Sequence, residues 1–177
     1  MKDIKNITKI GFMAAVMCVL GPVVIVLPFS PVPFSLATFG LYLCVYILGM
    51  KWATVSCLIY LLIGLVGVPV FSAFSGGPGK LLGPTGGYLI GYLFITLITG
   101  FFLGHWKSRA LHGIGLVLGT MGCYGFGTVW LAYQSSMTWK DAFLVGVVPF
   151  ILFDVIKIGI AMLLGEIISK RLKIAGL

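Results

Sequence analysis

The stretch Pro149–Ile168 reads PFILFDVIKIGIAMLLGEII, and its only charged residues are Asp154, Lys157 and Glu166. A helix of this length rises ~30 Å, which matches the hydrocarbon core of a bilayer. A proline at its start suits the first helical turn, because the missing N–H would have no partner there. The stretch therefore predicts a membrane-spanning helix that carries an acid and a base inside the membrane.

The composition of the whole 177-residue chain agrees with this reading. Hydrophobic residues make up 60% and charged residues 9%, whereas soluble domains carry about 25% charged residues. The mean hydropathy is +1.16, so the chain has too little polar surface to cover itself in water. We expect one all-α integral membrane domain with six transmembrane helices. Their predicted bounds are residues 10–27, 34–48, 52–68, 86–103, 113–132 and 149–168.

The basic residues divide unevenly between the predicted loops. The chain has 12 Lys and Arg against 4 Asp and Glu, a net charge of +8. Apart from Lys157, only Lys80 and Lys140 fall outside if the N-terminus is cytoplasmic. Cytoplasmic loops collect Lys and Arg, so we expect both termini in the cytoplasm of a prokaryotic cell. No basic patch is interleaved with aromatic residues, which argues against a nucleic-acid partner.

Asp154 and Lys157 are the sharpest signal in the sequence. Their i, i+3 spacing places them on one helix face, and a charge at the membrane centre costs ~2.5–3.5 kcal/mol on insertion scales. Two interpretations remain open, a polar ligand site and a purely structural ion pair. The ligand site is favoured, because the pair lies at a depth that an outer loop could reach.

That outer loop is Pro69–Thr85, which is rich in glycine and proline and also contains Phe71 and Phe74. A long loop with its own apolar residues often closes over a ligand, so a lid is favoured over a simple connector. Another outer loop, Pro28–Pro33, carries three prolines and is expected to be a stiff extended link.

Polar residues near two helix ends predict local structure. Thr138 stands three residues before Asp141, the spacing of a capping box, and predicts a short interfacial helix from Trp139 to about Val147. Near the inner end of the last span, Glu166 stands four residues before Lys170, which predicts an exposed i, i+4 ion pair.

Enzymatic and metal-binding motifs are missing from the sequence. It has no H-E-x-x-H, G-x-S-x-G or P-loop pattern, and its four cysteines and two histidines do not cluster. We therefore predict no catalytic residue, no metal and no cofactor. Without an ATP-binding motif the chain cannot drive ATP-coupled transport alone.

Four stretches together resemble the BioY family, the biotin-specific S components of energy-coupling factor (ECF) transporters. They are Pro31–Thr38 (PVPFSLAT), Gly67–Phe71 (GVPVF), Gly83–Tyr88 (GPTGGY) and P-F-x-x-x-D-x-x-K at Pro149–Lys157. Their order and spacing match, so the resemblance covers nearly the whole chain.

The resemblance implies a six-helix S-component fold that captures biotin on the outer side. It implies as partners a membrane coupling protein and two cytoplasmic ATPases. Small residues on the first helix would dock on the coupling protein, here Ala14, Ala15 and Cys18. The implied substrate-binding residues are Thr38, Phe71, Lys80, Thr85, Gly86, Gly87, Tyr88, Asp154 and Lys157.

The chemistry of biotin suits these residues. Its carboxylate needs a cation, which Lys157 or Lys80 can supply, and its ureido N–H groups need an acceptor such as Asp154. Its apolar body needs aromatic walls such as Tyr88 and Phe71. The alternatives are an S component for another vitamin and a stand-alone small-solute facilitator.

Overall fold

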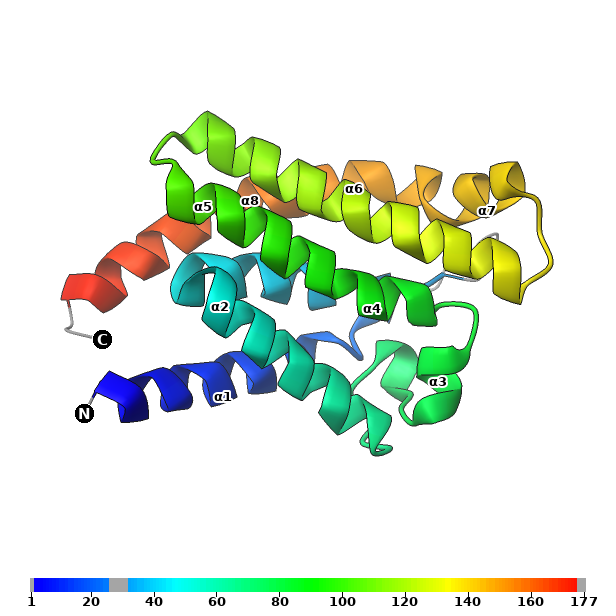
Figure 1. Ribbon diagram of the computed structural model, residues 1–177, viewed down its shortest axis with the longest axis horizontal. Coiled ribbons are helices and arrows are strands. Elements are labelled where there is room, and N and C mark those ends of the chain that lie inside the picture. Colours follow the sequence, from blue (N-terminus) through cyan, green and yellow to red (C-terminus); the bar gives the residue numbers. More distant parts are fainter. Residues whose placement is uncertain (1, 26–31, 175–177) are drawn as a thin grey trace.

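The computed structural model describes residues 2–25 and 32–174. The helices lie side by side in an elongated bundle (Figure 1). The elements are α1 (Lys2–Leu20), β1 (Val24–Ile25), β2 (Phe34–Ser35), α2 (Ala37–Leu65), η1 (Ser72–Phe74), α3 (Pro78–Leu82), α4 (Gly86–Phe94), η2 (Ile95–Thr99), α5 (Gly100–His105), α6 (Arg109–Gln134), α7 (Trp139–Gly146) and α8 (Val148–Ile174).

The first helix ends earlier than predicted. α1 stops at Leu20, because Pro22 cannot donate the hydrogen bond that would continue it. Val24 and Ile25 instead pair antiparallel with Ser35 and Phe34, so the prediction of helix beyond residue 20 was wrong over the described positions. Residues 26 and 27, and the predicted stiff link as far as residue 31, lie outside the described residues.

A hairpin bend divides α2 into two arms. Gly49 has φ +72°, a backbone conformation that residues with a Cβ adopt only at a cost. The chain reverses its direction there, and the second arm runs back at an angle to the first (Figure 1). The arms cover residues 37–48 and 50–65, which differ by two or three residues at one or both ends from the predicted spans 34–48 and 52–68.

Helices α4, η2 and α5 follow one another without a break over Gly86–His105, and η2 is a π-helical turn. The short helix α7 begins as predicted, because the Thr138 side chain accepts a hydrogen bond from the Asp141 backbone N–H at 3.2 Å. The predicted capping residue and short helix are therefore confirmed, while the position of the helix at the membrane interface stays a prediction. α8 follows α7 with a bend of 41°.

Several helices are long and apolar enough to cross a membrane. Among the described residues these are Ala37–Leu65, Gly86–His105 and Arg109–Gln134, with α7 and α8 together as a bent fourth. α1 begins and α8 ends at the same end of the molecule (Figure 1), as an even number of spans requires. The count of six spans and the cytoplasmic placement of the termini stay predictions.

Much of the outside of the bundle is apolar. Leu152, Val155 and Leu163 on α8 are 67%, 58% and 65% exposed, while Met17, Leu41 and Leu116 are fully buried. Exposing such a surface to water is unfavourable, whereas contact with lipid tails carries no such cost. The integral membrane assignment thus follows from the tertiary structure as well as from the composition.

Candidate functional site

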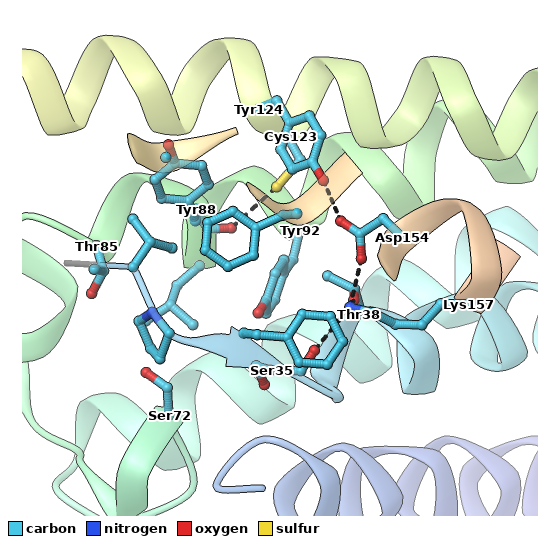
Figure 2. Close-up of a pocket in the computed structure, with 16 residues that line it drawn as sticks. Ser35, Thr38, Ser72, Thr85, Tyr88, Tyr92, Cys123, Tyr124, Asp154 and Lys157 are labelled. Atoms are coloured by element: carbon cyan, nitrogen blue, oxygen red, sulfur yellow. Dashed lines mark hydrogen bonds and ion pairs between the residues drawn. The ribbon is translucent and has the colours of Figure 1, made fainter. Parts of the chain in front are cut away.

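The ion pair predicted on the last helix is formed and buried. Lys157 Nζ lies 2.5 Å from Asp154 Oδ1, and the two residues are 7% and 5% exposed. Their spacing along α8 aims both side chains into the bundle, as Figure 2 shows. A charge removed from water in this way needs partners around its whole head group.

The other partners of Lys157 lie in β2 and in the first turn of α2. Its ammonium donates to Ser35 O at 3.0 Å and to Thr38 Oγ1 at 2.7 Å. It also lies 4.1 Å from the centre of the Phe34 ring, within the range of a cation–π contact. With the Asp154 ion pair these contacts surround the ammonium, and they tie the start of α2 to α8.

Asp154 is held from the opposite side by Tyr124 of α6. The Tyr124 hydroxyl donates a short hydrogen bond to Asp154 Oδ2, while the other carboxylate oxygen faces Lys157. Local spacing does not predict this contact, because the two residues are 30 positions apart. Tyr124 is therefore a site residue that only the packing of α6 on α8 reveals.

A cavity of about 70 Å³ adjoins this cluster. Five of the predicted binding residues line it, namely Thr38, Thr85, Tyr88, Asp154 and Lys157. Prediction from the sequence missed other lining residues, among them Phe34, Ser35, Ser72, Tyr92, Cys123, Tyr124 and Phe150. In Figure 2, Thr85 and Ser72 lie at one end of the labelled set, and Asp154 and Lys157 lie at the other.

Tyr88 forms one wall of the cavity and is wedged between helices. Its hydroxyl lies 3.3 Å from Thr128 Oγ1. Its ring fills the space that a Cβ at Gly127 would need, and its hydroxyl fills that of a Cβ at Gly146. Any larger residue at those two positions would displace the ring. The two glycines therefore fix where this aromatic wall stands.

Four other predicted binding residues do not line the cavity. Gly86 and Gly87 are buried beside it in the first turn of α4. Phe71 is fully buried, with its ring 5.5 Å from that of Tyr60. Lys80 lies on α3, and burial lowers the pKa of its ammonium.

The Pro69–Thr85 loop is folded rather than irregular. It contains η1 and α3, and the Phe71 N–H donates to Ser75 O at 2.9 Å. Its two aromatic residues differ sharply, since Phe71 is fully buried and Phe74 is 73% exposed. Phe71 therefore anchors the loop to the core, while Phe74 faces outward.

The predicted pair of Glu166 with Lys170 was wrong. Arg109 is the partner instead, with Nε 2.9 Å and Nη2 2.6 Å from Glu166 Oε2. The packing of α6 beside α8 brings in a guanidinium that can donate twice, which a flexible lysine on the same helix does not match.

The predicted docking residues on α1 differ in their exposure to the surface. Ala14 is 2% exposed, Cys18 is partly exposed, and Ala15 is exposed.

Comparisons with known proteins agree with this architecture. The chain matches the sequence model of the BioY family over residues 1–174. It is 40% identical to "Probable biotin transporter BioY" of Pyrococcus horikoshii, over 77% of this chain and 80% of that one. It is 38% identical to "Biotin transporter BioY" of Thermotoga maritima, over 83% and 84%. A crystal structure of "the S-component for biotin from an ECF-type ABC transporter" superposes with a TM-score of 0.87 at 30% identity, covering 96% of this chain and 93% of that one.

Proposed function

The chain belongs to the BioY family, and we propose that it captures biotin at the outer face of the cell membrane for import. It works as the S component of an ECF transporter and is not an enzyme. The names of its relatives and of its structural neighbour support this role. The energy comes from a partner module, consisting of a membrane coupling protein and two cytoplasmic ATPases.

One observation carries the assignment of the site. Asp154 and Lys157, the two charged residues that line the outer cavity, are buried side by side on α8. A cyclic urea presents an N–H donor next to a C=O acceptor. An adjacent carboxylate and ammonium are complementary to that pattern, since Asp154 can accept from the N–H and Lys157 can donate to the C=O.

The same geometry separates the two ends of the ligand. The thiophane ring and the methylene chain of biotin hold its carboxylate far from its ureido group. The 2.5 Å between Lys157 Nζ and Asp154 Oδ1 cannot span that separation. We therefore assign Asp154 and Lys157 to the ureido end and place the carboxylate at the other end of the cavity.

Two hydroxyl groups and a nearby lysine suit the carboxylate at that end. Ser72 and Thr85 lie there (Figure 2), and Lys80 lies on α3, just before Thr85 in the chain. Desolvation lowers the pKa of Lys80, and a carboxylate beside the ammonium would offset that shift. Tyr88 and Tyr92 line the space between the two ends and suit the apolar body of biotin.

The cavity has to widen when biotin enters. Its volume is about 70 Å³, whereas small-molecule sites usually measure ~300–1,000 Å³. The contacts of Lys157 with Ser35 and Thr38 close one side. They are the bonds that a ureido oxygen would replace, so opening is expected where β2 meets α2.

Docking on the coupling protein is proposed for the outer surface of α1. Gly11 and Ala15 are open there, and a Cβ added at Gly11 would meet no other described element of the chain within 4 Å. Small residues of this kind let two membrane helices approach closely. The exposed part of Cys18 can contact the coupling protein, while Ala14 is buried and packs against the rest of the bundle.

Equilibrium binding to the purified protein tests the proposed function. Labelled biotin should bind tightly and be displaced by unlabelled biotin but not by thiamine or riboflavin. Displacement by another vitamin at equal concentration would make the chain an S component for that vitamin. Weak, non-saturable binding of every vitamin would favour the stand-alone facilitator.

A further inference from the structure

A second and larger cavity lies at the end of the bundle where α1 begins and α8 ends. Its volume is about 800 Å³, and it opens between the bend of α2, α5, the first turn of α6 and the last turns of α8. Lys107, Arg109 and Lys170 line it together with two histidines. Glu166 is the single carboxylate among the lining residues, so positive charge dominates the cavity.

The one carboxylate is already neutralised. Arg109 donates to Glu166 Oε2 from both Nε and Nη2, and this pair joins α6 to α8 at the wall of the cavity. Lys107 and Lys170 form no ion pair among the described residues. Two cations without a carboxylate partner are therefore left among the residues that line the cavity.

The cavity also contains buried polar atoms without partners. Tyr46 is 9% exposed, and its hydroxyl is buried with no hydrogen-bond partner in the described part of the chain. The same holds for His112 Nδ1, while His112 Nε2 lies 2.7 Å from Trp106 O. A carbonyl only accepts, so Nε2 donates there, and in the neutral ring Nδ1 is left as an acceptor that a phosphate oxygen cannot satisfy. The Tyr46 hydroxyl is thus the buried donor that needs an acceptor. Unpaired buried polar groups are costly and point to a partner that the chain itself does not supply.

Exposed aromatic residues indicate how deep this cavity lies in the membrane. Trp106 is 40% exposed and Phe101 is 44% exposed, with ring centres 5.7 Å apart. Exposed tryptophan beside lysine and arginine is typical of the boundary between lipid tails and head groups. The distribution of basic residues predicts that this end of the bundle is cytoplasmic, and the cavity would then lie at the level of the inner head groups.

We propose that this cavity binds the phosphate head group of an anionic phospholipid from the inner leaflet. The phosphate oxygens accept from Lys107 and Lys170 and from the Tyr46 hydroxyl, and the acyl chains remain in the bilayer. Basic pockets between membrane helices on the cytoplasmic side favour such head groups. A zwitterionic head group adds a cation of its own and meets the positive cavity less well.

Lipid retention by the purified full-length chain tests the proposal. The protein is exchanged into micelles with phosphatidylglycerol or phosphatidylcholine, and bound lipid is counted by native mass spectrometry. Phosphatidylglycerol should be retained selectively, and Lys107→Gln should weaken its binding about fivefold. The matched control is Lys140→Gln, which removes a lysine at the opposite end. Equal losses for both variants would mean diffuse charge attraction and would overturn the site.

A second variant tests the buried hydroxyl without changing charge. Tyr46→Phe should lower phosphatidylglycerol retention and leave biotin binding intact. Tyr133→Phe, at a residue that is 86% exposed, should change neither. Equal retention by Tyr46→Phe and the native chain would overturn the role of Tyr46. A competition experiment with soluble glycerol phosphate separates a lipid from a free phosphate ester. If glycerol phosphate displaced the lipid at equal concentration, the site would bind a free phosphate ester instead.

Discussion

The Tyr124 hydroxyl donates a hydrogen bond to Asp154 Oδ2 across the interface between α6 and α8. Lys157 meets the other oxygen of the same carboxylate, so Asp154 is held from two sides by two different helices. A carboxylate fixed in this way keeps its orientation before a ligand arrives. Preorganisation of this kind lowers the entropic cost of binding.

Tyr124→Phe should therefore weaken biotin binding. The change leaves Asp154 Oδ2 without its donor, and an unsatisfied buried acceptor costs ~1–3 kcal/mol. Thermal unfolding in detergent and equilibrium biotin binding measure the two effects. Tyr133→Phe is the exposed control. A Tyr124→Phe protein with native affinity would show that Tyr124 supports the fold alone.

The double variant Asp154→Asn with Lys157→Met separates a ligand site from a structural ion pair. Removing one partner alone leaves an unpaired buried charge, whereas removing both avoids that penalty. The double variant should fold but bind biotin ~10–150-fold more weakly, from the loss of one charge-assisted hydrogen bond. Biotin titration of the monodisperse protein measures this. Native affinity would end the assignment of the site to this pair.

Biotin amide, in which an amide replaces the carboxylate, tests which end of the ligand each lysine meets. If Lys157 contacts the ureido group, Lys157→Met should weaken biotin and biotin amide by the same factor. Lys80→Met should weaken biotin more than the amide, because only biotin carries the charge. Competition binding with both ligands measures the ratios, and Lys140→Met is the control. If Lys157→Met lowered the affinity for biotin more than that for biotin amide, Lys157 would be the residue that contacts the carboxylate.

The two phenylalanines of the Pro69–Thr85 loop should behave differently. Phe71→Ala should destabilise the protein by ~3–5 kcal/mol, because it empties a fully buried site. Phe74→Ala should leave unfolding nearly unchanged, since its side chain is 73% exposed. If the loop closes over biotin, the ligand should also protect it from proteolysis. Equal cleavage with and without saturating biotin would exclude a lid.

Tags at the two termini test the topology. With six spans and both ends inside, neither tag should react with a membrane-impermeant reagent in intact cells. Both should react after permeabilisation, which is the control. Labelling of one terminus alone would require an odd number of spans.

The sequence determined those features that depend on local chemistry. Composition identified the membrane protein, and the i, i+3 spacing of Asp154 and Lys157 predicted a shared face that the structure confirms. Thr138 predicted the start of α7, and the motifs ending in Lys157 identified the family. These features need only the properties of residues within one or two helical turns, which a sequence displays directly.

Only the tertiary structure decided which distant residues complete each cluster. Tyr124 reaches Asp154, Thr38 reaches Lys157 and Arg109 replaces Lys170 beside Glu166. The tertiary structure also shows that Phe71 and Lys80 do not line the cavity. Such contacts depend on how the helices cross and rotate against one another. Many apolar faces can pack in a membrane, so hydrophobic pattern alone does not fix that arrangement.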